Sequence, residues 1–117
     1  MKTTFEHLRL GMERRLGLVP RPTYEALKAT QWSPLFERLM RNRLIMGGLR
    51  YGVFGDPDKP AYDNVGSMKR RLALYEETGN LEHLVDLANI AMCEFIEGKH
   101  PKRHFEAADD GDHTQPK

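Results

Sequence analysis

Three residues in the C-terminal half of the chain, Glu82, His83 and Asp86, have the side chains and the spacing of a divalent-cation site. Residues three or four positions apart on a helix are neighbours on one face, so a helix here would bring these groups together. Magnesium is bound in proteins mainly through oxygen ligands such as carboxylates. We therefore predict Glu82 and Asp86 as metal ligands and Mg²⁺ as the cofactor. A structural role is the alternative for Glu82, because a carboxylate in the first turn stabilises the helix dipole.

A basic cluster, Lys69, Arg70 and Arg71, lies on the segment that precedes these acidic residues. Lysine and arginine bind phosphate oxygens, and arginine does so through two donors at once. We predict all three as nucleotide-binding residues. Two other roles stay open for them: ion pairs with Glu82 and Asp86, or a charged face in water.

Aromatic, basic and amide side chains gather around a loop that is rich in Gly, Pro and Asp. A nucleotide pocket needs rings that stack on the base and cations that meet the phosphates. The binding residues predicted here are Arg50, Tyr51, Lys59, Tyr62 and Asn64. The alternative is ordinary packing, since tyrosines at helix ends are frequent anchors.

A polar stripe runs beside the apolar face of the segment that carries the acidic residues: Glu82, Asp86, Asn89 and Cys93. Polar groups next to a buried face cost free energy unless a partner satisfies them. We therefore add Asn89 to the predicted nucleotide-binding residues. The sequence contains no P-loop, no GxSxG motif and no recognisable Cys/His nucleophile pair, so it names no catalytic residue.

Two helices must position these groups. The stretch 80–97 places apolar residues three and four apart, and Asn80 and Gly98 suit its two ends. The stretch 64–78 has the same spacing and ends at Gly79. The short connection EETGN predicts that the two helices are antiparallel neighbours. Their predicted shared core consists of Met68, Leu72, Leu84, Val85, Ala88 and Met92.

Three more helices are predicted earlier in the chain, over about 4–16, 23–30 and 34–51. Ser33 followed by Pro34 is a typical helix start. Gly47–Gly48 inside the third helix indicates the close approach of a neighbouring helix or a kink. Residues 53–64 form a turn-rich loop before the next helix, which Asp63 or Asn64 caps.

Composition limits the class of protein. The 117 residues are 39% apolar and 30% charged, with a formal net charge of +1 and one cysteine. We predict an all-α protein, a helical bundle of about four helices over residues 1–106, with a disordered, flexible tail at 107–117. The low net charge gives no indication of nucleic-acid binding, and no apolar run is long enough for a membrane span. The single cysteine favours a reducing, cytoplasmic location.

The stretch YDNVGSMKRRLALYEETGNLEHLVDLANIAMCEF resembles small phage-encoded proteins related to the all-α NTP pyrophosphatases, the MazG-like superfamily. The resemblance covers about 34–105 and implies an oligomeric helical bundle that holds Mg²⁺ and a nucleoside triphosphate and releases pyrophosphate. Of the usual ExxE and ExxD motifs, the second reads HLVD here, so that Asp86 alone matches. Lys69, Arg70 and Arg71 stand where the first motif has carboxylates.

Three hypotheses about function follow. The first is an Mg²⁺-dependent nucleotide pyrophosphohydrolase in the cytoplasm, which is the host cytoplasm if a phage encodes the chain. The second is a nucleotide-binding protein without turnover, such as a phage anti-defence protein. The third is a helical protein-interaction module. A homo-oligomer is expected in each case, because short helices leave much apolar surface exposed.

Overall fold

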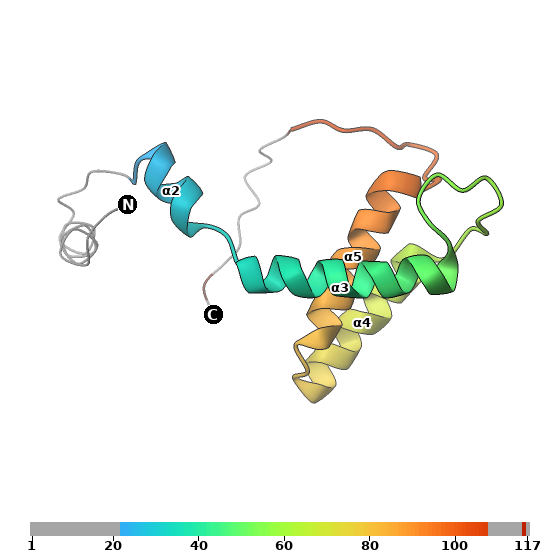
Figure 1. Ribbon diagram of the computed structural model, residues 1–117, viewed down its shortest axis with the longest axis horizontal. Coiled ribbons are helices and arrows are strands. Elements are labelled where there is room, and N and C mark those ends of the chain that lie inside the picture. Colours follow the sequence, from blue (N-terminus) through green and yellow to red (C-terminus); the bar gives the residue numbers. More distant parts are fainter. Residues whose placement is uncertain (1–21, 108–115, 117) are drawn as a thin grey trace. The chain divides into compact units, whose positions relative to one another are not determined.

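The structure is a computed structural model that describes residues 22–107 and residue 116. These residues contain four helices and no strand: α2 (Tyr24–Thr30), α3 (Pro34–Tyr51), α4 (Asn64–Thr78) and α5 (Glu82–Glu97) (Figure 1). The predicted all-α class with about four helices is confirmed. The helix predicted over 4–16, and all of the predicted tail except residues 107 and 116, lie outside the described residues.

The chain divides into two compact units, Met1–Arg38 and Leu39–Lys117, and the boundary falls within α3. In the first unit, Thr23 caps α2 by accepting a hydrogen bond from the Ala26 N–H at 3.1 Å. Ser33 caps α3 in the same way, at 3.1 Å from the Phe36 nitrogen. Pro34 then takes the first helical position, where its missing N–H costs nothing. Both predicted helix starts are therefore confirmed.

In the second unit, α4 and α5 pack side by side as an antiparallel pair, as the short connection predicted. Asp63 caps α4 through the Gly66 N–H at 3.0 Å, and Gly79 ends it in the left-handed conformation, φ +70°. The connection is only residues 79–81. Helix α5 starts two residues later than predicted, because the Asn80 side chain accepts the N–H of Glu82.

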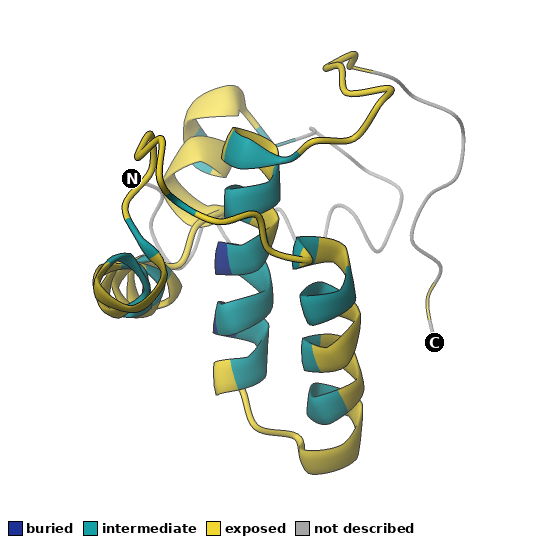
Figure 2. Cartoon of the chain, turned by 90° about the vertical axis from the view of Figure 1, so that its right-hand side faces the viewer, coloured by how far each residue is buried: buried dark blue, intermediate teal, exposed yellow. Residues whose placement is uncertain are grey.

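The second half of α3 runs across this pair (Figures 1 and 2) and continues through Gly47–Gly48 without a break. A Cβ atom at Gly47 would meet only Tyr51, and one at Gly48 only Val53, both at ordinary contact distance. The interpretation of these glycines as a close helix–helix approach is therefore wrong.

Little of the described chain is buried. Val85 is the one buried apolar residue among the described positions, Asn89 is the one buried polar residue, and both lie on α5 (Figure 2). Of the predicted core, Met68, Leu84, Ala88 and Met92 are partly buried. Leu72 is 47% exposed, and its place in the predicted core is wrong. Three helices alone cannot enclose every apolar position.

None of the helices that the structure describes has both the length and the apolar character needed to cross a membrane. The predicted division into one domain over 1–106 and a tail involves residues outside the described range and stays a prediction.

Candidate functional site

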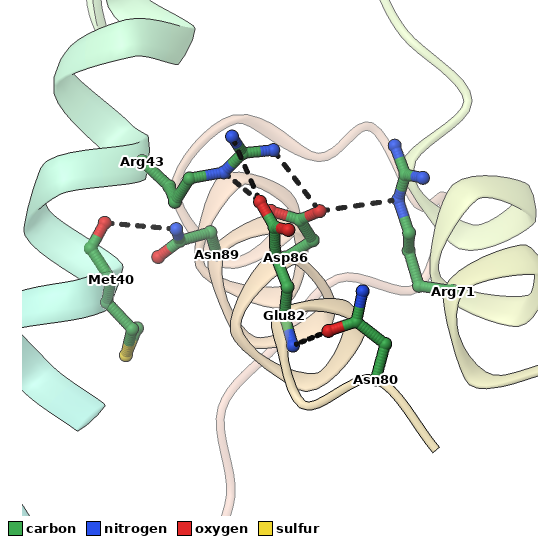
Figure 3. A network of polar contacts seen from close by, with 7 residues as sticks. All are labelled: Met40, Arg43, Arg71, Asn80, Glu82, Asp86 and Asn89. Carbon is green, nitrogen blue, oxygen red and sulfur yellow. Dashed lines mark hydrogen bonds and ion pairs between the residues drawn. The ribbon is translucent and has the colours of Figure 1, made fainter. Parts of the chain in front are cut away.

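Asp86, in the second turn of α5, is the centre of a network of charged side chains (Figure 3). Arg43 from α3 approaches it with two nitrogens, Nε at 3.2 Å from Oδ1 and Nη2 at 3.5 Å from Oδ2. The third nitrogen of the same guanidinium lies 3.2 Å from Oε1 of Glu82. Arg71 from α4 brings its Nε to 4.0 Å from Asp86 Oδ2. We call Arg43, Arg71, Glu82 and Asp86 the charge network.

The charge network is balanced and only partly removed from water. It holds two guanidinium and two carboxylate groups from three helices. The side chains are 14% exposed for Asp86, 34% for Arg43, 35% for Arg71 and 51% for Glu82. The hydrogen bond to Asp86, its charge, and more weakly the charge of Glu82 raise the pKa of Arg43 above its ordinary value. Arg43 is therefore a permanent cation that serves both carboxylates.

Asn89 lies one turn beyond Asp86 and connects α5 to the backbone of α3. Its amide nitrogen donates to the carbonyl oxygen of Met40 at 3.0 Å, which fixes the orientation of the amide group (Figure 3). Its Oδ1 atom is buried and accepts no hydrogen bond from the protein. A buried acceptor without a donor is costly. The network therefore has an adjacent oxygen that a donor on a ligand would satisfy.

The basic cluster of α4 does not act as one unit. Arg71 reaches Asp86, whereas Lys69 and Arg70 are exposed and form no ion pair within the described part of the chain. Successive residues of a helix are rotated by about 100°, so three in a row cannot face one neighbour. The predicted alternative of an ion pair with Asp86 is thus observed for Arg71.

The loop residues predicted for nucleotide binding lie at the other end of α5. Lys59 Nζ is 2.7 Å from Glu97 Oε1 and also sits over the ring of Phe54. Asn64 donates to Glu94 Oε2 at 3.1 Å. These contacts attach the loop to the last turns of α5.

The two tyrosines of this group contact each other, edge to face, with ring centres 5.5 Å apart. Tyr51 and Tyr62 thus connect the end of α3 to the residues before α4, as the packing alternative predicts. Arg50 is exposed in the last turn of α3. Asp86 and Glu94 are eight residues apart, or about 12 Å along a helix, so the loop residues and the charge network form two separate groups.

Sequence reasoning did not select Arg43, which is the main partner of Asp86. A signal was present, because Arg43 occupies an inward position of α3 between Met40 and Gly47 at helical spacing. A cation among apolar positions needs a counter-charge from another element. Glu94 and Glu97 were missed in the same way, as the acceptors for Asn64 and Lys59.

Glu82 and Asp86 are the only pair of predicted metal ligands, and within the described residues no group of three or more His, Cys, Asp or Glu side chains could hold a metal ion. Two carboxylates nevertheless fit Mg²⁺ when a nucleotide supplies further oxygens, because Mg²⁺ commonly binds through one or two carboxylates, water and substrate phosphates. The donor set therefore fits a magnesium–nucleotide complex better than the metal alone.

Comparison with known proteins adds no relative: no protein-family model, curated protein or solved structure matches the chain. The resemblance to the MazG-like superfamily therefore rests on the residues quoted for it, and the charge network is interpreted from its own chemistry.

Proposed function

We propose that the protein binds the magnesium complex of a nucleoside triphosphate at the charge network. The observation that carries this proposal is that two carboxylates and two guanidinium groups from three helices are linked by ion pairs of 3.2 to 4.0 Å and remain partly exposed. A magnesium–triphosphate complex has the complementary composition, one divalent cation and a chain of anionic oxygens.

Binding would exchange one set of ion pairs for another. Glu82 and Asp86 would hold the metal, and Arg43 and Arg71 would bind phosphate oxygens with their planar donor groups. Each charge that loses a partner gains a new one, so no uncompensated charge is left in a partly buried place. The Asn89 oxygen, which lacks a donor, lies beside this exchange.

Hydrolysis with release of pyrophosphate is the second candidate function, and it is the activity that the resemblance implies. Bound Mg²⁺ would supply charge neutralisation and polarisation of a phosphoryl oxygen. The observation in its favour is the half-exposed Glu82, a carboxylate open to water beside the more buried Asp86. Binding without turnover needs fewer groups than hydrolysis, because no residue has to activate the attacking water.

The experiment is isothermal titration of the full chain with a panel of NTPs and dNTPs, with and without Mg²⁺, followed by an assay for pyrophosphate. We expect heat of binding that requires Mg²⁺. Asp86→Asn and Arg43→Met should each weaken binding at least about tenfold, which corresponds to about 1.4 kcal/mol. Arg38→Met, an exposed arginine earlier in the same helix, is the matched control and should bind as the original chain does.

Absence of Mg²⁺-dependent binding would refute the proposal. The charge network would then be purely structural, and Asp86→Asn would lower the melting temperature without any effect of nucleotide. Pyrophosphate release by the original chain, lost in Asp86→Asn, would favour the hydrolase over the binding protein. The expected homo-oligomer is a separate proposal that depends on a different surface of the molecule.

A further inference from the structure

Helix α5 carries a second line of apolar residues, of which Leu81, Ala91 and Phe95 are exposed, while Leu84 and Ala88 are partly buried. Five apolar residues recur at spacings of three and four and so form one line along the helix. We call this line the α5 stripe; it comprises Leu81, just before the first turn, and Leu84, Ala88, Ala91 and Phe95. Its two ends, Leu81 and Phe95, are 68% and 67% exposed.

The stripe is distinct from the faces with which α5 contacts its neighbours. Asn89 points to α3, where it bonds to Met40. Asp86 lies between α3 and α4, where it meets Arg43 and Arg71, and Glu94 points to α4, where it accepts from Asn64. At about 100° per residue, the centre of the stripe lies roughly 120° from Asn89 and roughly 100° from Glu94. Helix α5 therefore has three faces, and two of them are in use.

We infer that the α5 stripe binds the same stripe of a second copy of this chain, in the antiparallel direction, about a two-fold axis that passes near Ala88. In this arrangement Leu81 of one copy lies opposite Phe95 of the other, while the two Ala88 side chains face each other. The small side chains of Ala88 and Ala91 allow the two helices to approach closely near the axis, and Leu81, Leu84 and Phe95 supply the larger contacts along a stripe of about 21 Å.

Charge selects the second copy and its direction. Exposed Glu76 and Glu77 lie at the end of α4 that adjoins the start of α5, whereas exposed Lys99 and Lys102 follow its end. An antiparallel pair brings each acidic end to a basic end and also opposes the two helix dipoles favourably. A parallel pair would place like charges together.

The basic end is held in place in the single chain. The guanidinium of Arg103 donates to carbonyl oxygens at the end of α5, at 3.2 Å from Glu94 O and 2.9 Å from Gly98 O, and also bonds to the carbonyl oxygen of Phe95. These bonds cap the helix with a cation, which its dipole favours. The segment 99–103 is therefore already positioned beside Phe95, where the acidic end of the second copy would lie.

The test is sedimentation velocity of the full chain between about 1 and 100 µM, since a single helix pair of this length is at the small end of stable interfaces. We expect a concentration-dependent dimer that Phe95→Glu converts to a monomer. Leu49→Glu, at an 86% exposed apolar residue of α3, is the matched control and should leave the dimer unchanged. A chain that stays monomeric, or a dimer that survives Phe95→Glu, would overturn the inference.

Crosslinking tests the direction of pairing. In a Cys93→Ser background, Ala88→Cys should form a disulfide-linked dimer, because an antiparallel pair brings this position next to its own copy. A mixture of Leu81→Cys and Phe95→Cys chains should crosslink to each other, and neither should crosslink to itself. Self-crosslinking of Leu81→Cys would show a parallel pair and contradict the inference.

Phe95→Glu also tests whether another segment of the same chain covers the α5 stripe. Because Phe95 is exposed in the single chain, the variant should melt at the same temperature as the original chain at concentrations where both are monomeric. A lower melting temperature of the monomer would mean that another segment of the same chain covers the stripe, and this result would also refute the dimer.

Discussion

Arg43 forms ion pairs with both Asp86 and Glu82, so the coupling free energies of the two pairs can be compared within one network. The perturbations are Arg43→Met, which keeps the aliphatic volume, and Asp86→Asn, which keeps the shape. The two approaches of the Arg43–Asp86 pair measure 3.2 and 3.5 Å, and Asp86 is 14% exposed. Glu82 meets Arg43 through one approach of 3.2 Å and is 51% exposed.

The expected coupling free energy of the Arg43–Asp86 ion pair lies between the values for exposed and for fully buried ion pairs. Exposed ion pairs contribute about 0.2–1 kcal/mol, and removal of one partner from a fully buried pair costs about 3–5 kcal/mol. Since Arg43 is one-third exposed, we expect a coupling free energy of about 1–2 kcal/mol between Arg43 and Asp86. The coupling between Arg43 and Glu82 should stay below about 1 kcal/mol and fall further in 1 M salt.

The single substitutions should be unequal. Arg43→Met leaves Asp86 with Arg71 as a second cation at 4.0 Å. Asp86→Asn leaves two guanidinium groups that face a neutral amide, with Glu82 as the remaining counter-charge. We therefore expect Asp86→Asn to lower the free energy of unfolding by about 1.5–3 kcal/mol and Arg43→Met by less.

Urea denaturation of the four proteins of each double-mutant cycle, at one low protein concentration, measures both couplings. Glu77→Gln, an exposed carboxylate of α4, serves as the control for loss of a negative charge. The reasoning is refuted if the Arg43–Asp86 coupling is near zero, or if the Arg43–Glu82 coupling is the larger of the two.

Two further predictions concern glycines and the cysteine. Gly47→Ala should stabilise α3 by about 0.5–1 kcal/mol, since the helix interior has room for the methyl group; Gly66→Ala should destabilise by about 0.5–2 kcal/mol, because its Cβ would collide with the capping carboxylate of Asp63. Thermal melts in which Gly47→Ala and Gly66→Ala both raise, or both lower, the melting temperature would contradict this contrast. Burial raises the pKa of the Cys93 thiol; the charge of Lys59 lowers it by less, and that of Glu97 raises it further, so labelling by a thiol reagent at pH 8 should be slower in the folded chain than in urea. Labelling of Cys93 at equal rates in the folded and the urea-unfolded chain would contradict this prediction. Because the pKa of the thiol is higher in the folded than in the unfolded chain, its contribution to stability is present below the unfolded pKa and is lost as pH rises through the folded pKa.

The sequence by itself determined the four described helices and all of their ends to within two residues. Thr23, Ser33 and Asp63 cap helices through hydrogen bonds to N–H groups three residues ahead, and Gly79 ends α4 through a bond to Tyr75. All of these bonds join residues within four positions of one another. Local sequence specifies such bonds, because forming them requires no other element of the fold.

Only the tertiary structure decided which charges meet. The polar stripe of α5 indicated that Asp86 needs a partner, but the sequence offered several cations, and the nearest part of the chain favoured Arg70 or Arg71. Arg43 is the main partner because α3 crosses α5 at Met40 and Asn89, which brings the guanidinium over the carboxylate. The choice among partners of equal charge depends on where helices cross, and helical periodicity contains no information about that position.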